Sequence, residues 1–224
     1  MENKKLIVLC GVDGAGKSTQ INLITEYLTS QNKKVKKLHF PMYGYSEFSE
    51  IICKFLRGEF GSVDEVNPTF IATIYSMDRY MYKEQLLKDM EENDIVLLDR
   101  YVFSNLAFQG AKISDSKKST DLIKWIWKFE FDFLKLPYPD LIIYLDVPMK
   151  TIEERLNEKR VGSDRDYLKG EKDIHEKDIN FQSRVRKIYL KLNTKENYYI
   201  IPTYNDNGEI LSPNDLFETY KKLF

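Results

Sequence analysis

A glycine-rich loop between a strand pattern and a helix pattern constrains this chain more than any other feature. Residues 11–18 read Gly-Val-Asp-Gly-Ala-Gly-Lys-Ser, which fits G-x-x-x-x-G-K-[ST]. The loop follows the apolar run Leu6 to Cys10 and precedes a helix pattern that starts near Lys17. Glycines let the backbone fold closely around phosphates, and the helix start offers free N–H groups. The segment therefore predicts a phosphate-binding P-loop.

Each residue type in this loop has an expected task. Lys17 is expected to reach the β/γ-phosphates of a nucleoside triphosphate, and Ser18 is expected to ligate magnesium. The residues predicted to bind the triphosphate are Gly11, Gly14, Ala15, Gly16, Lys17, Ser18 and Thr19.

The rest of the chain alternates short β-rich runs with longer segments of helical period. Continuous apolar runs of this kind favour strands that are buried on both faces of a parallel sheet. We therefore predict one α/β domain over residues 1–224 with the P-loop NTPase fold, and about five parallel strands with helices on both faces. The predicted strands are Leu6 to Cys10, Val35 to Phe40, Ile95 to Leu98, Leu141 to Val147, and Tyr198 to Ile201.

The dipeptide Asp99-Arg100 follows one of these runs directly. In open α/β sheets ligands collect at the carboxyl ends of strands, so this pair should face the same crevice as the P-loop. Asp99 is expected to bind magnesium directly or through water, and Arg100 is expected to grip a phosphate. A structural salt bridge that caps the strand is the alternative.

A charged segment from about Glu153 to Asp178 loses apolar periodicity, so we interpret it as a mobile, solvent-exposed lid. Arg155, Arg160 and Arg165 lie in it, and arginines on a closing lid can stabilise charge that develops during phosphoryl transfer.

The composition narrows the partners. Lys and Arg total 34 against 35 Asp and Glu, a formal net charge of -1, so no overall basic field attracts nucleic acid or a membrane surface. No apolar run approaches the ~20 residues of a membrane span, which indicates a cytoplasmic protein. Cys10 and Cys53 have no metal-site spacing and are expected to be free thiols. His39 and His175 show no ligand pattern and are interpreted as structural or surface residues.

The absence of a histidine base is itself informative. A hydroxyl acceptor needs a general base, whereas a nucleoside monophosphate has a second pKa near ~6 and arrives largely deprotonated. A monophosphate acceptor therefore fits this sequence.

These motifs together resemble the thymidylate kinase family, and the resemblance covers nearly the whole chain. It rests on the P-loop with Asp13 inside it and on four further segments, of which the run after Asp99 is the most specific. The four segments are Phe40-Pro41, Tyr75-Ser76-Met77-Asp78-Arg79, Asp99-Arg100-Tyr101-Val102-Phe103-Ser104-Asn105-Leu106-Ala107-Phe108-Gln109-Gly110-Ala111, and Pro139-Asp140.

The resemblance implies transfer of the γ-phosphoryl of ATP to dTMP with Mg²⁺, in dTTP biosynthesis. It implies that Asp13 binds the 3′-hydroxyl, Tyr75 stacks on thymine, and Arg79 donates to a thymine oxygen. Arg100 would hold the acceptor phosphate, and Phe108 would crowd out a 2′-hydroxyl. The full set expected around the substrate is Asp13, Phe40, Pro41, Tyr75, Arg79, Arg100, Ser104, Asn105, Phe108 and Gln109.

Three features depart from relatives in this family. Cys10 stands where many members have Glu, Tyr43 stands where some have an arginine that contacts phosphate, and the lid from Asp164 to Lys177 is longer than in bacterial members. Gly14 occupies the position at which some members carry an assisting arginine, so this chain resembles the type whose arginine comes from the lid. The predicted catalytic residues are Lys17, Asp99, Arg100, Arg160 and Arg165.

Two other functions remain open at this point. A deoxynucleoside kinase would need a base near its hydroxyl acceptor, and the segment from Phe40 to Tyr43 offers no carboxylate. A P-loop switch or regulatory ATPase would not need the pair Tyr75 and Arg79.

The segment Leu122 to Leu134 carries more aromatic residues than one buried face requires. Leu122, Ile126, Phe129 and Phe133 fall on one helical face, while Trp125, Trp127 and Phe131 lie around the others. This surplus indicates a subunit contact, hence a homodimer, or else a helix buried deeply in its own core.

Replacing Arg160 or Arg165 with Ala should lower kcat by ~10²-fold with little change in KM, because an arginine that contacts the moving phosphoryl acts mainly in the transition state. Steady-state kinetics on each variant would identify the residue, with Arg165 favoured slightly. Near-normal kcat in both single variants and in the double variant would rule out this mechanism.

Overall fold

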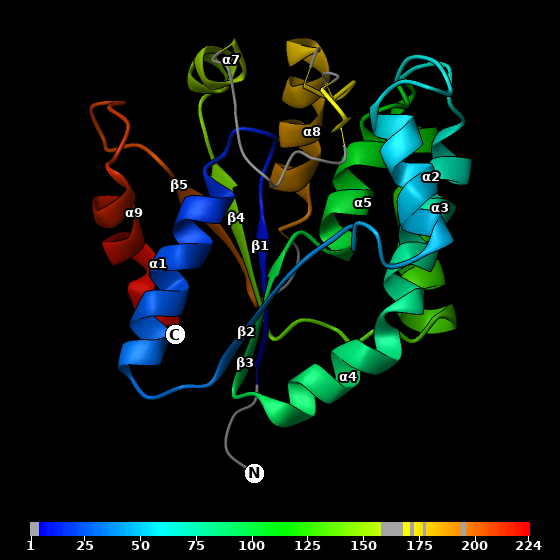
Figure 1. Cartoon of the computed structure of the whole chain (residues 1–224). Helices are drawn as coiled ribbons and strands as arrows, with labels where there is room; N and C mark the ends of the chain where they lie inside the picture. The colour runs from blue at the N-terminus through cyan, green and yellow to red at the C-terminus, as the bar shows by residue number, and fades with distance from the viewer. Residues whose placement is uncertain (1–4, 158–167, 171–172, 177, 194–195) are drawn as a thin grey trace.

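The computed structural model describes residues 5–157, 168–170, 173–176, 178–193 and 196–224. Its centre is a five-stranded sheet with the order β2-β3-β1-β4-β5, in which every pairing is parallel. Figure 1 shows this sheet nearly edge-on, with helices on both sides. The predicted α/β fold of the P-loop type is confirmed. The strands are β1 (Lys5–Cys10), β2 (Val35–His39), β3 (Ile95–Asp99), β4 (Leu141–Asp146) and β5 (Tyr198–Pro202).

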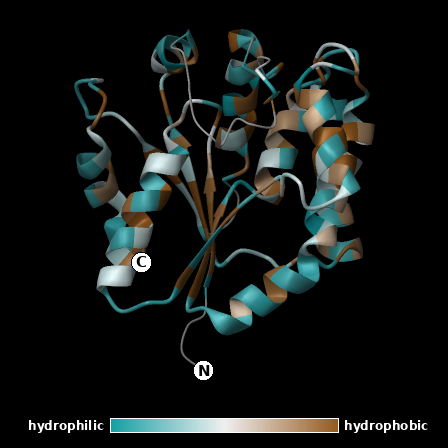
Figure 2. Cartoon of the chain, viewed as in Figure 1, coloured by the Kyte–Doolittle hydropathy of each residue, from teal (hydrophilic) through white to brown (hydrophobic). Residues whose placement is uncertain are grey.

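The three inner strands are apolar because helices cover both of their faces. All six residues of β4 are buried, and Figure 2 shows the apolar colour concentrated along the strands in the middle of the molecule. The edge strands differ, since no residue of β2 is fully buried and only Tyr198 of β5 is. The expectation of a continuous buried run was therefore wrong for β2 and β5, each of which has a neighbour on one side only.

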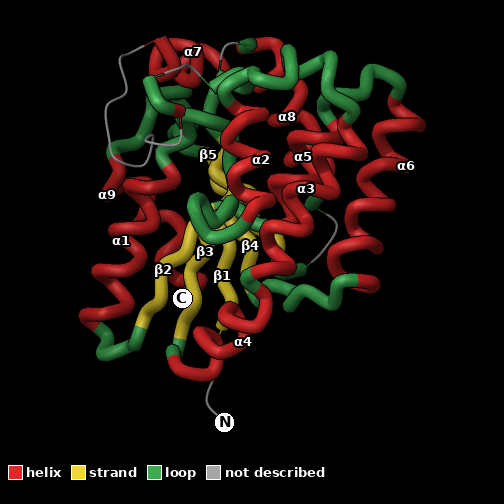
Figure 3. The backbone as a smooth tube through the Cα atoms, turned by 45° about the vertical axis from the view of Figure 1, so that its right-hand side comes forward, coloured by secondary structure: helices red, strands yellow, loops and turns green. Residues whose placement is uncertain are grey.

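The helices form two layers around the sheet. In Figure 1, α1 and α9 lie together on one side of it, and α2 to α5 lie on the other. Figure 3 shows α6 outside α3 and α5. The helices are α1 (Lys17–Ser30), α2 (Glu47–Leu56), α3 (Pro68–Met81), α4 (Lys83–Glu92), α5 (Val102–Gly110), α6 (Ser116–Trp127), η1 (Lys128–Phe133), α7 (Met149–Asn157), α8 (Ile179–Lys191), α9 (Pro213–Tyr220) and η3 (Lys221–Leu223).

The aromatic segment after α6 is a π-helix, η1, rather than a continuation of the α-helix. The wider turn of a π-helix breaks the 3.6-residue period from Lys128 onward. Leu122 and Ile126 are buried as expected, but Phe133 is 74% exposed. Glu130 takes the inward position instead and is fully buried. The predicted single apolar face was therefore wrong beyond Ile126.

Parts of the segment predicted to be an exposed lid pack against the core. Its first residues, in α7, agree with the expectation, since Glu153 and Glu154 are exposed. Further along, Leu168, Ile174 and His175 are buried, and the Ile174 amide donates to the Leu56 carbonyl at 3.0 Å. The expectation of solvent exposure was wrong for these three residues, because Ile174 bonds to the end of α2 and the His175 ring packs among Phe55, Phe108 and Phe181.

Lys112, just after α5, places its charged end in this apolar region. Its Nζ lies 4.2 Å from the centroid of the Phe55 ring. This nitrogen is buried, with no hydrogen-bond partner among the described residues. Burial lowers the pKa of Lys112 to about 7. Most lysine side chains keep the ammonium group in water, whereas Lys112 buries it.

Replacing Lys112 with Met should raise the free energy of unfolding at pH 7 by roughly 2–4 kcal/mol, since one pKa unit corresponds to about 1.4 kcal/mol and the lost cation–π contact offsets part of the gain. The lowered pKa means that the unfolded chain binds this proton below pH 10.5, whereas the native state binds it only below about pH 7. The native protein therefore gains stability as pH rises through that window, and the difference between variant and parent should shrink. Urea unfolding at pH 7 and pH 9.5 measures both values; a difference that is independent of pH would contradict this account.

Candidate active site

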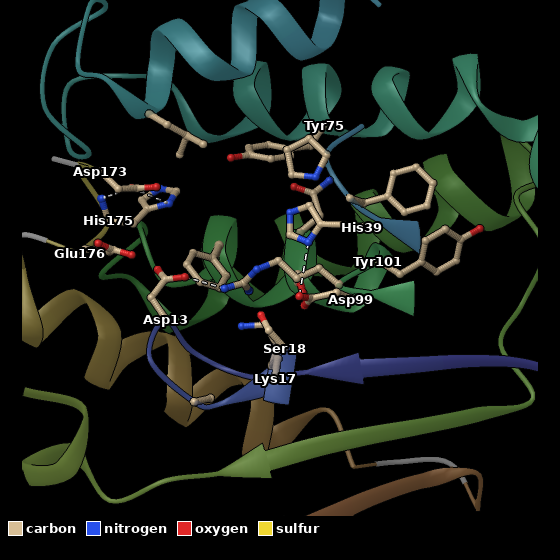
Figure 4. A pocket seen from close by; sticks show the side chains of 18 of the residues that line it. Asp13, Lys17, Ser18, His39, Tyr75, Asp99, Tyr101, Asp173, His175 and Glu176 are labelled. Carbon is tan, nitrogen blue, oxygen red and sulfur yellow. Dashed lines mark hydrogen bonds and ion pairs between the residues drawn. The ribbon is translucent and has the colours of Figure 1, made fainter. Parts of the chain in front are cut away.

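A cavity of about 860 Å³ opens beside the carboxyl ends of β1 and β3. Figure 4 shows Lys17 and Ser18 of the P-loop on one side of it and Tyr75 of α3 on the other. Nearly all of the predicted site residues line this cavity. They are Asp13, Gly14, Ala15, Gly16, Lys17, Ser18, Thr19, Phe40, Pro41, Tyr75, Arg79, Asp99, Arg100, Ser104, Asn105, Phe108 and Gln109.

Three predicted residues stand apart from this lining. Gly11 lies beneath the loop, where an added Cβ would come 2.8 Å from the Cβ of Ala15, so its role is close packing. Arg160 and Arg165 lie outside the residues that the structure describes, and their predicted role stays a prediction.

The P-loop backbone turns back over the start of α1. Gly14 and Gly16 have φ values of 81° and 83°, a left-handed backbone conformation that residues with a Cβ rarely adopt. Gly16 is the residue before α1, so the loop brings the amide groups of the helix start to the cavity. The Lys17 ammonium is held over the loop, with Nζ 3.3 Å from the Val12 carbonyl oxygen.

Arg100 and Asp13 form the central ion pair of the cavity. Arg100 has a positive φ of 64°, which turns its side chain from the end of β3 toward the P-loop. Its Nη2 donates to Asp13 Oδ1 at 2.5 Å, and its Nη1 donates to the Gly11 carbonyl at 3.0 Å. Burial alone would raise the pKa of Asp13, but Arg100 and then Lys17 hold it below its usual value.

Asp99 presents a second carboxylate at the same edge of the sheet. Burial would raise the pKa of Asp99, but Lys17 and His39 outweigh that effect and hold it well below its usual range. His39 Nδ1 lies 3.4 Å from Asp99 Oδ2, and Figure 4 shows this contact. Asp99 Oδ1 is buried without a hydrogen-bond partner among the described residues. An ionised oxygen in this position fits a cation that bound phosphates bring with them.

Gln182 of α8 connects Asp13 to the segment that precedes this helix. Its Nε2 donates to Asp13 Oδ2 at 2.7 Å and to the His175 carbonyl at 2.9 Å, while its Oε1 accepts from the Asp13 amide at 3.1 Å. His175 stacks on Phe181, with ring centroids 5.1 Å apart, and also contacts Phe108. Burial lowers the pKa of His175 to about 3, so its ring is neutral.

Seven lining residues were not predicted from the sequence. Both histidines are among them. We interpreted His39 and His175 as structural or surface residues, and that interpretation did not predict that they line the cavity. Tyr101 belongs to the run after Asp99 and Tyr43 was noted as a departure from relatives, but neither was assigned to the site. No local pattern marks the other five, because they come from separate segments of the chain. The seven are His39, Tyr43, Leu56, Tyr101, Asp173, His175 and Glu176.

The far end of the cavity carries amide and guanidinium groups beside aromatic rings. Arg79 of α3 forms a two-pronged salt bridge with Glu130 of η1, in which Nε donates to Oε2 and Nη2 donates to Oε1, both at 2.6 Å. Asn105 of α5 donates to the same carboxylate at 2.8 Å. Burial raises the pKa of Tyr75, so its phenol stays neutral. This end can receive a flat, neutral group through stacking and hydrogen bonds.

One lid arginine that the structure describes reaches the P-loop. Arg155 of α7 donates from Nη1 to the Gly14 carbonyl at 3.0 Å. This contact brings a positive charge from the predicted lid segment to the edge of the triphosphate-binding loop.

The fold and this cavity define a P-loop phosphotransferase. The sequence model of the family described as thymidylate kinase matches residues 9–212. A probable thymidylate kinase 1 of Saccharolobus solfataricus is 31% identical over 209 residues, which cover 93% of this chain and 93% of that protein. A thymidylate kinase of Mycobacterium tuberculosis is 32% identical over 187 residues, covering 84% of this chain and 85% of that protein. The chain therefore belongs to the thymidylate kinase family.

Solved structures agree on the fold. The thymidylate kinase of Candida albicans superposes with a TM-score of 0.70 at 19% identity, covering 98% of this chain and 92% of that one. Membership of this family makes the chain a nucleoside monophosphate kinase. Among the described residues, no helix is long and apolar enough to cross a membrane.

Proposed function

We propose that this protein transfers the γ-phosphoryl group of ATP to dTMP, giving ADP and dTDP, with Mg²⁺ as the metal. The observation that carries the proposal is a single cavity with a phosphate-binding loop at one side and aromatic, guanidinium and amide groups at the other. Such a cavity can hold the triphosphate of a donor and the base of a second nucleotide at once. The reaction supplies the diphosphate from which dTTP is made.

On the donor side, Lys17 supports the triphosphate as charge moves from the γ-phosphoryl to the leaving oxygen. The backbone amide groups of the P-loop share this task. Ser18, whose hydroxyl is exposed, and Asp99 would hold Mg²⁺ together with phosphate oxygens and water. Bound Mg²⁺ neutralises charge on the β- and γ-phosphates.

On the acceptor side, Arg100 would hold the 5′-phosphate of dTMP. Its contacts with Asp13 and Gly11 use two of its five N–H donors, so the guanidinium retains capacity for phosphate oxygens. The nucleophile is a phosphate oxygen that is already largely deprotonated at neutral pH, so no side chain has to remove a proton. The catalytic work is positioning and charge stabilisation.

The sugar and base would occupy the part of the cavity between Asp13 and Tyr75. Asp13 would accept from the 3′-hydroxyl. The ring of Phe108 lies 4.9 Å from the guanidinium carbon of Arg100, which pairs with Asp13. Tyr75 would stack on the thymine ring, with Arg79, Asn105 and Gln109 around the edge of the base. Phe40, Pro41 and Ser104 complete this wall.

The lid segment would close over the donor phosphates and contribute an arginine. Arg155 supports this idea, since its guanidinium already contacts the P-loop at Gly14. Arg160 and Arg165 remain the predicted partners of the moving phosphoryl group.

A homodimer and a cytoplasmic location are further parts of the proposal. An aromatic ladder on the outer side of α6 and η1 supports the dimer. Trp125 and Phe129 are stacked at 5.1 Å, Phe129 and Phe133 are stacked at 5.6 Å, and Phe133 is 74% exposed. Exposed aromatic surface of this kind is typical of subunit contacts.

The proposed reaction predicts that ADP release from ATP depends on dTMP. A coupled assay against a panel of nucleosides and nucleoside monophosphates should give the highest kcat/KM with dTMP, because the cavity provides both a phosphate grip and a base site. Faster turnover of thymidine than of dTMP would show that the acceptor is a hydroxyl, and the proposal would fail.

The position of Phe108 predicts selection against ribose. Its buried ring lies against the Arg100 guanidinium that pairs with Asp13, so we expect it to crowd a 2′-hydroxyl, and thymine ribonucleoside monophosphate should be a poor acceptor. Replacing Phe108 with Ala should narrow the difference in kcat/KM between the ribo and deoxy acceptors by ~10-fold, since a few carbon atoms in a pocket are worth ~1–3 kcal/mol. Equal kcat/KM for the two acceptors in the unmodified protein would contradict the assignment.

A further inference from the structure

Glu130 is a fully buried carboxylate that does not line the cavity but contacts two residues that do. It lies in the π-helical turn η1, whose altered period turns it inward while Phe133 faces outward. Arg79 donates to both of its oxygens at 2.6 Å, and Asn105 donates to Oε1 at 2.8 Å. One side chain therefore holds two of the groups that face the proposed base site.

These contacts fix the orientation of the Asn105 side-chain amide, that is, the sides to which its nitrogen and its oxygen point. Its Nδ2 donates to Glu130 Oε1 and to the Ala72 carbonyl at 3.0 Å, and both partners can only accept. Turning the amide over would place an oxygen against these two acceptors. The Asn105 oxygen Oδ1 is consequently held away from Glu130, and it is buried with no hydrogen-bond partner in the described part of the chain.

A buried acceptor without a partner is costly unless a ligand supplies a donor. The pairing edge of thymine has such a donor, its N3–H group, directly beside carbonyl oxygens that accept. Arg79 provides the complementary donor, since Glu130 takes only two of its five N–H groups. Cytosine has the opposite pattern: its ring nitrogen N3 carries no hydrogen and accepts, and the neighbouring amino group donates.

We infer that Glu130 is a positioning residue that sets the base selectivity of this site, by holding Asn105 as an acceptor and Arg79 as a donor toward the base. This inference rests on the proposed function, because it assigns the base of the acceptor nucleotide to this end of the cavity. Glu130 itself touches neither the base nor the reacting phosphates. Its effect passes through the two side chains that it orients.

The substitution Glu130→Gln tests this role. The carboxylate accepts three bonds, two from Arg79 and one from Asn105, whereas a glutamine has one acceptor oxygen and an NH₂ group that can only donate. The NH₂ group would face a donor of Arg79 or of Asn105, so the two side chains lose their fixed arrangement. The acceptors compared are dTMP and 3-deazathymidine monophosphate, in which N3–H is replaced by C–H. In the parent protein we expect kcat/KM to favour dTMP by ~10²-fold or more, and in the variant that ratio should fall by at least ~10-fold, mainly through KM for dTMP.

The matched control is Asp146→Asn. Asp146 is likewise a buried carboxylate held by two bonds from an arginine, with Arg186 at 2.7 and 2.8 Å, but it does not line the cavity. Removing the charge of Asp146 should leave the ratio of kcat/KM between dTMP and the 3-deaza analogue unchanged, even if the stability of the protein falls. A purely structural role for Glu130 would lower kcat/KM for both acceptors together, and an unchanged ratio in Glu130→Gln would overturn the inference.

A second measurement uses the unmodified protein without substrate. If Glu130 holds the amide, the side-chain NH₂ protons of Asn105 should exchange with solvent at least ~10²-fold more slowly than those of the exposed Asn207, as judged by NMR. Equal exchange rates would overturn the inference, whether or not Glu130→Gln folds. Because no turnover is needed, this result is also separate from the proposed function, which would fail through a lack of dTMP phosphorylation.

Discussion

The ion pair between Arg100 and Asp13 joins the two strand ends on which the site is built. Arg100 follows β3 and Asp13 follows β1, and these strands are neighbours in the sheet. A left-handed backbone at Arg100 costs ~1–2 kcal/mol in a residue with a Cβ. The contacts of its guanidinium with Asp13 and with the Gly11 carbonyl offset that cost. The result is a positive charge fixed over the P-loop, where a phosphate is expected.

Asp13 extends this arrangement to the segment before α8. Each of its carboxylate oxygens has its own partner, Arg100 for Oδ1 and Gln182 for Oδ2. Gln182 in turn bonds the carbonyl of His175, whose neutral ring lies among Phe55, Phe108 and Phe181. The segment that leads into α8 is thereby linked to the P-loop through one chain of hydrogen bonds.

The sequence alone predicted those parts of the fold and site that depend on local patterns. The P-loop is one continuous segment, and its glycines have the positive φ angles that its tight backbone requires. All five strands were found near their observed bounds because strand runs are apolar, and the edge strands β2 and β5 were misjudged only in their exposure. The residues that line the cavity agree closely with the family resemblance, although their roles remain predictions.

What the sequence did not predict depends on contacts between distant segments. Glu130 lies 51 residues from Arg79, and nothing in the helical pattern of its segment distinguishes it from a solvent-facing charge. The change to π-helical geometry at Lys128 reverses which residues face inward, and a fixed period of 3.6 residues cannot anticipate it. The burial of His175 and Lys112 was missed for a similar reason, since it depends on contacts with residues far away in the sequence, such as Phe55.

The buried pair of Arg79 and Glu130 is hard to explain by stability alone. Removing two charges from water is costly, and an apolar pair of similar size is often equally stable. The pair can be explained if its role is to orient side chains. Because Glu130 holds the Arg79 guanidinium from one side, the remaining N–H donors of Arg79 stay on the other side. The same carboxylate gives the Asn105 amide one orientation without adding net charge to the interior. A base that presents a donor beside an acceptor would meet complementary groups that are already in place, so little rotational freedom would be lost when it binds.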